Sequence, residues 1–360
     1  MYSRVLGTGS ALPKRIVTNG EFAAMLARDG IETSDEWIRT RTGIESRHFA
    51  DEAEGETTSS LAVAAARRAL EAANVETSEI DLIIVATTTP DMVFPSVACR
   101  VQAALGARGC AAFDVQAVCA GFIYALNAAD AMLRAGPYRA AIVIGAEVMS
   151  RVLDMKDRST CVLFGDGAGA VVLKASSDPG ILAARMYADG DYGEKVLSLT
   201  ASLNHGVISG DPYIRMDGRQ VFRLAVEGLV GSAREVADLA CVHTEDVALF
   251  VPHQANLRIM TMVAAKLGIP GEDGEDRCRA RQHVGRERAA CARPRRARGH
   301  GEARRARPAS GRRRRHGLGV GAHPLVSGAQ KPENPANTGG EILFSVDPPP
   351  AKLLPIQFTP

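Results

Sequence analysis

The sequence lacks closely spaced cysteines and long apolar runs. Its seven cysteines, at positions 99, 110, 119, 161, 241, 278 and 291, are odd in number and include no Cys-x-x-Cys pair. This spacing predicts free thiols and neither a disulfide framework nor a metal site. No segment approaches the roughly 18 apolar residues that span a membrane, and the first residues lack the pattern of a secretory signal. These absences predict a cytoplasmic protein without a membrane partner.

The stretch 271–317 lacks large apolar side chains. Val284 is its only large aliphatic residue, whereas it contains sixteen arginines against six acidic residues. The formal net charge of +2 therefore hides a net negative charge on residues 1–270. A stretch of this kind cannot bury enough apolar surface to offset the entropy lost on ordering. We predict that residues 271–360 form a disordered tail, unlike the native, folded sequence that precedes it.

The chain before this tail has the pattern of an α/β enzyme. Apolar runs such as "DLIIVATTTP" and "AAIVIGAE" alternate with Ala-rich helical stretches, which predicts a sheet covered by helices on both faces. The segments "EIDLIIVATTTPD" (79–91) and "TEDVALFVPHQAN" (244–256) share a pattern, which indicates two related halves around one cleft. We place these halves at residues 1–175 and 176–270.

Cys119 lies between a predicted strand and a predicted helix, in "DVQAVCAGF" (114–122). A cysteine among alanines is most often an inert buried residue. At a helix N-terminus, however, unpaired N–H groups and the helix dipole favour the thiolate, and small neighbours let a substrate approach. This setting favours a nucleophile. Its candidate partner is His253 in "LFVPHQAN", for which the alternative is a histidine satisfied within a turn.

Four separated motifs carry a resemblance to a known family. "ETSDEWIRTRTGI" (32–44), "DVQAVCAGF", "CVLFGDGAGAVVL" (161–173) and "VPHQANLRIM" (251–260) resemble β-ketoacyl-acyl carrier protein synthase III, a condensing enzyme of fatty-acid synthesis. The resemblance implies a thiolase-like α/β fold with two βαβαβ halves in five αβαβα layers, the second half being incomplete here. It also implies a homodimer, in which Phe94 of one protomer lines the partner's pocket.

The same resemblance implies the chemistry. Cys119 takes an acyl group, usually acetyl, from acyl-CoA and passes it to the carbanion made by decarboxylation of malonyl-acyl carrier protein. His253 and a family asparagine donate hydrogen bonds to the thioester oxygen. No cofactor is implied besides the acyl-CoA substrate. "GDGAGA" (165–170) leads into a predicted strand and not into a helix, so we interpret it as a tight turn near the site and not as a dinucleotide-binding loop.

Binding residues carry over by resemblance alone. The candidate CoA contacts are Thr33, Trp37, Arg41, Arg158 and Asn256. The candidate carrier-protein contacts are Gln254, Ala255, Asn256, Leu257, Arg258, Arg223 and Lys266. For Trp37, the only tryptophan, the alternative is an anchor of the core. For each basic residue in this set, the alternative is an ordinary solvated surface side chain.

The resemblance ends after Pro270, where the family has a Gly-Asn-Thr-Ser segment with the asparagine. "RQHVG" (281–285) can be encoded so that a one-base shift reads Gly-Asn-Thr-Ser. We therefore interpret the tail as a shifted reading frame, which predicts impaired condensation. One alternative is a related acyltransferase with another primer or acceptor. The other is an inactive product whose basic tail binds nucleic acid nonspecifically, although the aromatic residues that bind single strands are missing.

Overall fold

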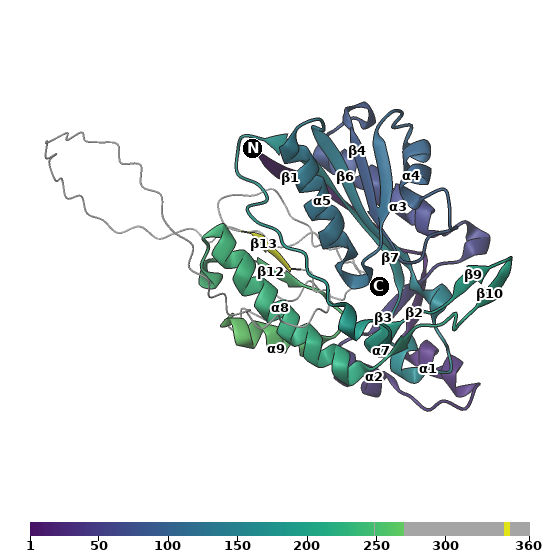
Figure 1. The fold of residues 1–360 in the computed structure, drawn as a ribbon. Helices are drawn as coiled ribbons and strands as arrows, with labels where there is room; N and C mark the ends of the chain where they lie inside the picture. Colours follow the sequence, from purple (N-terminus) through teal and green to yellow (C-terminus); the bar gives the residue numbers. More distant parts are fainter. Residues whose placement is uncertain (248, 270–341, 346–360) are drawn as a thin grey trace, which may run out of the picture. The chain divides into compact units, whose positions relative to one another are not determined.

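A five-stranded mixed sheet forms the scaffold of the first half (Figure 1). The computed structural model describes residues 1–247, 249–269 and the backbone of 342–345. The sheet has the order β1-β7-β6-β4-β5; β4 runs parallel to β5 and β6, whereas β7 is antiparallel to β6 and β1. Its strands are β1 (Tyr2–Ala11), β4 (Leu82–Ala86), β5 (Ala111–Val115), β6 (Ala140–Val148) and β7 (Asp166–Ser176).

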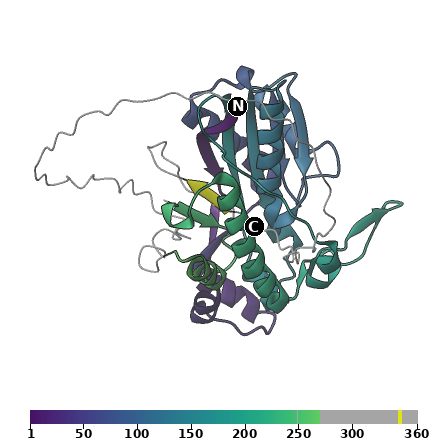
Figure 2. The same ribbon diagram turned by 60° about the vertical axis from the view of Figure 1, so that its left-hand side comes forward.

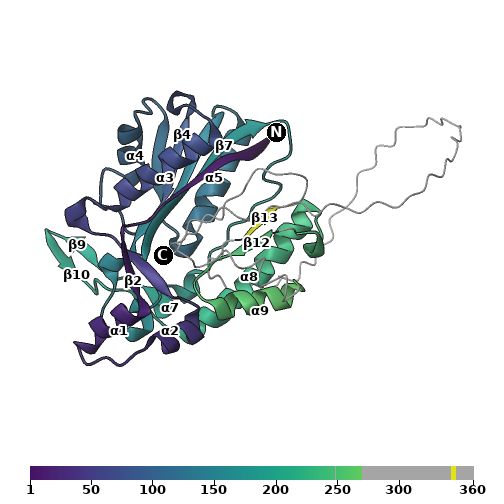
Figure 3. The same cartoon turned by 180° about the vertical axis from the view of Figure 1, so that it is seen from behind.

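Helices cover both faces of this sheet. Alternate side chains of a strand point to opposite faces, so Ile83 and Val85 pack with α3 (Thr58–Ala73) and α4 (Val97–Leu105). The intervening Leu82 and Ile84 pack with α5 (Gly121–Ala135). Figures 1 and 3 show α5 on one side of the sheet and α3 on the other. The predicted α/β sandwich of helix, sheet and helix is thus confirmed.

Two glycines of β1 explain how closely α3 approaches the sheet. A Cβ atom at Gly7 would lie 2.3 Å from the Ala73 nitrogen, and one at Gly9 would lie 2.3 Å from the Ala65 carbonyl oxygen. Real Cβ atoms are not found at such distances, so any side chain here would push the helix outward. The alanines that α3 turns toward β1 complete this tight packing, because small facing residues let the two backbones meet.

A smaller cluster extends the first half beyond the sheet. It contains the paired strands β2 (Arg15–Thr18) and β3 (Ser46–Phe49), and three helices: α1 (Asn19–Ala27), α2 (Asp35–Thr42) and α6 (Arg158–Cys161). These elements share a buried apolar core. The described residues also contain short 3-10 turns: η1 (Glu52–Glu54), η2 (Thr77–Glu79), η3 (Val118–Ala120), η4 (Met149–Val152), η5 (Gly190–Tyr192) and η6 (Thr244–Asp246).

The second half has a core of its own around α8 (Gly218–Ala240) and α9 (Leu257–Leu267). Both helices pack with β12 (Leu249–Pro252), which pairs antiparallel with β13 (Ile342–Ser345). Figure 2 shows β13 in yellow beside the green second half. The segment that leads into α8 contains α7 (Gly193–Val196), β8 (Leu197–Ser198), β9 (Ser202–Asn204), β10 (Val207–Ser209) and β11 (Arg215–Met216).

The described residues test some of the sequence predictions and leave others untested. The half boundaries at 175 and 270 stay predictions, and the predicted disorder of the tail concerns residues that mostly lie outside the described part. The strand at Ile342–Ser345 was not anticipated. The tight turn predicted for "GDGAGA" was wrong, because residues from Asp166 onward form β7. No described helix is both long and apolar enough to cross a membrane.

Candidate active site

A cavity of about 800 Å³ brings together residues from both halves. Cys119 lines it from the first half, and His253 lines it from the second. Apolar side chains such as Phe164 and Phe222 supply much of the remaining wall. Of the other residues singled out from the sequence, the lining includes Trp37, Arg41, Gln254, Ala255, Asn256 and Arg258. It does not include Thr33, Arg158, Arg223, Leu257 and Lys266.

Cys119 lies in the turn η3, between the end of β5 and the start of α5. The preceding Val118 has φ +48, a left-handed conformation that is costly for a β-branched residue and typical of strained functional turns. Gly121 lets the start of α5 lie close to β4, because a Cβ atom there would lie 3.1 Å from the Ala86 Cβ. No side chain caps the first turn of α5. The thiol thus lies at the positive end of a fifteen-residue helix.

Cys161 shows what an inert setting looks like in the same molecule. It is fully buried at the end of α6, and burial, with the nearby Asp157 carboxylate, raises the pKa of its thiol to about 12. Burial also raises the pKa of Cys110. Both thiols are therefore protonated at neutral pH, and neither lines the cavity. Cys119 is the cysteine of the described chain that faces this cavity.

His253 directly follows β12, at the cavity wall. Burial lowers its pKa to about 4, so the imidazole is neutral at pH 7. A neutral imidazole donates one N–H and accepts at the other ring nitrogen. The next helix begins at once, because the Asn256 side chain accepts a hydrogen bond from the Arg258 N–H at 2.9 Å and caps α9. His253 is therefore held between a strand end and a capped helix.

An aromatic and two guanidinium groups form a second feature at the cavity. The Arg41 and Arg158 guanidinium carbons lie 4.6 and 4.4 Å from the centre of the Trp37 ring. Trp37 and Arg41 belong to α2, which Ser34 caps by accepting from the Trp37 N–H at 3.1 Å. Arg158 begins α6 and donates to the Glu32 carbonyl. Next to it, the buried Thr33 hydroxyl has no hydrogen-bond partner within the described residues.

Four of the candidate carrier-protein contacts are exposed, and one of them, Arg258, also lines the cavity. Leu257 and Arg258 lie in the first turn of α9, and Lys266 lies in its last turn. Arg223 is exposed on α8. The Arg258 guanidinium lies 5.7 Å from the Phe222 ring, which links this surface to the cavity wall. Their role in docking stays a prediction.

A loop between β4 and α4 carries an exposed apolar tip at Met92, Val93 and Phe94, and Phe94 is 81% exposed. The buried Glu147 carboxylate holds its start, accepting from the Thr88 N–H at 2.7 Å and from the Thr88 hydroxyl at 2.6 Å. Burial raises the pKa of Glu147. No local sequence pattern indicates this anchor, because it joins two segments 59 residues apart.

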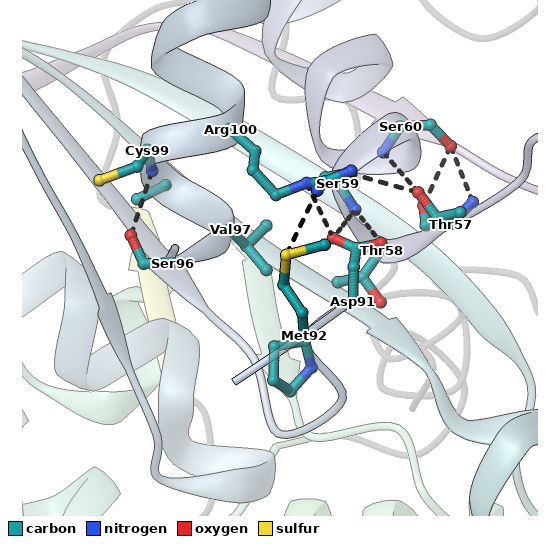
Figure 4. Close-up of polar contacts among 12 residues, drawn as sticks. Thr57, Thr58, Ser59, Ser60, Asp91, Met92, Ser96, Val97, Cys99 and Arg100 are labelled. Carbon is teal, nitrogen blue, oxygen red and sulfur yellow. Dashed lines mark hydrogen bonds and ion pairs between the residues drawn. The ribbon is translucent and has the colours of Figure 1, made fainter. Parts of the chain in front are cut away.

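The next part of the loop is held by Asp91. Its carboxylate accepts from the Ser59 N–H at 3.1 Å and lies 3.6 Å from the Arg100 Nε (Figure 4). Ser59 belongs to α3 and Arg100 to α4, so the carboxylate joins the loop to both helices. The exposed tip is thus presented on a firmly held base.

Two cavity residues were missed because their segment has no periodic pattern. Asp189 and Tyr192 line the cavity from the irregular stretch that follows β7. No group of metal-binding side chains occurs within the described residues.

Comparisons with known proteins agree with this geometry. The family model of 3-oxoacyl-(acyl-carrier-protein) synthase III matches residues 113–190, and the model of its C-terminal part matches residues 238–280. The β-ketoacyl-(acyl-carrier-protein) synthase III of Bordetella petrii is 59% identical over 271 residues, which are 75% of this chain and 82% of that protein.

Solved structures confirm the thiolase-like α/β fold. The 3-oxoacyl-(acyl-carrier-protein) synthase III of Aquifex aeolicus is 49% identical, with a TM-score of 0.68 over 75% of this chain and 82% of that one. A priming β-ketosynthase of a polyketide biosynthetic pathway is 42% identical, with a TM-score of 0.70 over 75% of this chain and 79% of that one. The identity to the Bordetella protein over most of its length decides the assignment. The chain belongs to the β-ketoacyl-acyl carrier protein synthase III family.

Proposed function

We propose that this protein is an acyltransferase that condenses an acyl-CoA primer, first of all acetyl-CoA, with malonyl-acyl carrier protein. The product is a 3-oxoacyl-acyl carrier protein, which starts a fatty-acid chain. The observation that carries this proposal is one cavity lined by a thiol at a helix N-terminus and by a neutral imidazole. Membership of the synthase III family supports it.

The first step is acyl transfer to Cys119. Its thiolate attacks the thioester carbonyl of acyl-CoA, a carbon–sulfur bond forms, and the bond to the CoA sulfur breaks. The CoA thiolate leaves and takes a proton from solvent. The N–H groups of the uncapped first turn of α5 lie beside this position, where they would stabilise both the attacking thiolate and the oxyanion.

The second step is decarboxylative condensation. The malonyl group loses CO2, and the released electron pair becomes an enolate whose oxygen bears the charge. Because the pKa of His253 is about 4, its neutral ring donates an N–H to that oxygen and transfers no proton to it. The enolate carbon then attacks the acyl-Cys119 carbonyl, and the Cys119 thiolate leaves. Each step balances without a redox partner or cofactor.

Substrate binding completes the proposal. Trp37, Arg41 and Arg158 would hold the adenine nucleotide of CoA, since aromatic and guanidinium faces stack on bases. Thr33 and Asn256 would add further contacts. The surface of Gln254, Ala255, Asn256, Leu257, Arg258, Arg223 and Lys266 would dock the acidic carrier protein. A cytoplasmic location stays a prediction of the sequence.

A homodimer is part of the proposal. The exposed Phe94 tip on its anchored loop is suited to enter a partner protomer, and burying it would remove a large apolar side chain from water. The proposed partners are thus acyl-CoA, malonyl-acyl carrier protein and a second copy of this chain.

The test measures product formation. The protein is mixed with acetyl-CoA and malonyl-acyl carrier protein, and the carrier protein is analysed by mass spectrometry for a 3-oxobutanoyl group. Its appearance only when acetyl-CoA and Cys119 are both present supports the proposal. Decarboxylation that never yields an extended carrier, even in a protein with the family's C-terminal segment restored, contradicts it.

A second candidate keeps the chemistry and changes the primer. The likeness to a polyketide priming β-ketosynthase favours it, because that relative is about as similar in structure as the Aquifex enzyme. Rates of Cys119 acylation across acetyl-, butyryl- and longer acyl-CoA decide between them. A preference for acetyl-CoA supports the first candidate.

A further inference from the structure

Arg47 of β3 is a buried cation surrounded by neutral groups. Its Nη1 donates to the Asn19 side-chain oxygen at 2.9 Å, and its Nη2 donates to the Val162 carbonyl at 3.0 Å. Its guanidinium carbon lies 4.5 Å from the centre of the Phe22 ring. Within the described chain, no carboxylate forms an ion pair with it. It is 5% exposed, and its Nε has no hydrogen-bond partner there.

Stability alone does not explain this residue. Burial lowers the pKa of Arg47 to about 10, which records the cost of taking the charge out of water. It is still protonated at pH 7. A methionine of similar length would fill much of the same space without that desolvation cost, so what the guanidinium adds is its two directed hydrogen bonds, to Asn19 and to Val162.

Through its Nη1, the guanidinium is connected to α2. Asn19, itself buried, passes the contact on: its amide nitrogen donates to the Asp35 carboxylate at 2.8 Å and to the Ile44 carbonyl at 2.7 Å. Asp35 is the first residue of α2, and Ile44 comes just after the residue that ends it. Both ends of the helix that carries Trp37 and Arg41 are thus held through Asn19.

Through its Nη2, the guanidinium is connected to α6. Val162 directly follows Cys161, the last residue of the short helix that begins with Arg158. The Arg158 guanidinium carbon lies 4.4 Å from the Trp37 ring centre. A planar guanidinium can donate to both carbonyl-type acceptors at once, which fixes their separation. Arg47 therefore sets the distance between α2, which carries Trp37, and α6, which carries Arg158.

We infer that Arg47, acting through Asn19 and Val162, is a positioning residue for the nucleotide end of acyl-CoA. This inference rests on the proposed function, in which Trp37, Arg41 and Arg158 bind the nucleotide. Arg47 itself touches no substrate. It holds α2 and α6, which carry Trp37 and Arg158, in a fixed relation to each other, so its loss should affect substrates that carry a nucleotide and spare those that do not.

The test compares two acyl donors on the full chain. Acetyl-CoA carries the adenine nucleotide, whereas acetyl-pantetheine presents the same thioester without it. For each donor, the half-saturating concentration and the maximal rate of Cys119 acylation are measured. Arg47→Met should raise the half-saturating concentration of acetyl-CoA about ten-fold, since one stacked cation contributes an effect of this size. The maximal rate and the acetyl-pantetheine values should stay within about two-fold of the unchanged protein, because neither involves the stacked base.

Trp37 adds a spectroscopic readout, because it is the only tryptophan. Arg47→Met should shift its emission in the absence of any donor. Arg151→Met is the matched control: Arg151 donates to the Thr58 hydroxyl at 3.0 Å and to the Thr89 carbonyl at 2.6 Å, away from α2 and α6. It should lower thermal stability without moving the Trp37 emission or the ratio of the two donors.

A milder variant guards against misfolding. Asp35→Ala removes the link from Asn19 to α2 at an exposed position, and it should raise the acetyl-CoA requirement in the same direction by a smaller factor. Two results would overturn the role of Arg47. In the first, Arg47→Met raises the half-saturating concentrations of acetyl-CoA and acetyl-pantetheine equally. In the second, neither Arg47→Met nor Asp35→Ala raises the acetyl-CoA requirement, although Trp37→Ala does. If Trp37→Ala itself leaves the ratio of the donors unchanged, the nucleotide assignment fails, and the inference fails with it.

Discussion

Two strands near the site differ in how they are paired: β4, which neighbours the strand β5 that leads to Cys119, and β12, which leads to His253. β4 lies between β5 and β6, and all five of its residues are buried. β12 pairs, within the described residues, with β13 alone, a segment that lies about 90 residues further along the chain. The first half therefore builds its scaffold from its own sequence, whereas the second depends on the distant C-terminal segment.

This difference divides the proposed reaction. Acylation of Cys119 requires the turn before α5, which the first sheet positions. In the proposed reaction, condensation would also use His253 and a second donor to the enolate oxygen, and the segment in which the family's asparagine is expected lies outside the described residues. We therefore expect a chain that loads an acyl group better than it extends one.

Restoring the family reading frame after Pro270 should have the largest effect. Removing one oxyanion donor costs roughly 10²–10³ in rate, so the restored protein should release CO2 from malonyl-acyl carrier protein at least that much faster. Its rate of Cys119 acylation should change by less than about ten-fold, because loading relies on the first half. Equal condensation by both proteins would contradict the division of labour.

His253 should give the second-half core a distinct pH dependence. Its pKa is about 4 in the folded protein, against 6.5 for an ordinary histidine. Between these values the unfolded chain binds the proton more readily, so the free energy of unfolding falls as the pH drops from 6.5 to 4. The loss amounts to roughly 3 kcal/mol.

The measurement is urea unfolding across this pH range, with His253→Asn as the comparison. The variant cannot titrate at this position, and it should lose roughly 3 kcal/mol less than the unchanged protein on acidification. Parallel curves for the two proteins would show that the imidazole is not buried in its neutral form.

Truncation of the chain before Ile342 removes β13 and so tests directly whether its pairing protects β12. Losing two or so backbone hydrogen bonds at about 1 kcal/mol each should reduce the hydrogen-exchange protection of β12 amides by roughly 30-fold. Amides of β4 serve as the internal reference and should keep their protection. If truncation lowers the protection of β12 and β4 amides equally, or lowers neither, the contrast between the halves is contradicted.

The smallest effect concerns the nucleotide contact. Trp37→Ala should raise the acetyl-CoA concentration needed for acylation by about 3- to 10-fold, as expected for one lost stacking partner. Alkylation of Cys119 by iodoacetamide should proceed at the unchanged rate, since the turn before α5 is untouched. An unaltered acetyl-CoA requirement would return Trp37 to the role of a core anchor.

The sheet and helices of the first half could be predicted because their signals are local. The apolar run of β4 and the alanine stripe of α3 indicate burial from neighbouring residues alone. The placement of Cys119 between strand and helix follows from the same local pattern. These features need no information about distant segments.

The remaining features depend on contacts between distant segments. Arg47 meets Val162 across 115 positions, and no local pattern marks either partner. The glycine-rich start of β7 has the composition of a turn, yet a Cβ atom at Gly167 would lie 3.0 Å from Leu12. These glycines provide close packing within a strand, which composition alone does not distinguish from a turn.

The central claim is that Cys119 is the nucleophile of this synthase, and peptide mapping tests it most directly. The full chain is incubated with radiolabelled acetyl-CoA, digested and analysed for the labelled peptide, alongside Cys119→Ala. We predict that the label is confined to the peptide containing Cys119 and is absent from the variant. A label on Cys99, Cys110 or Cys161 that survives in Cys119→Ala would contradict the account.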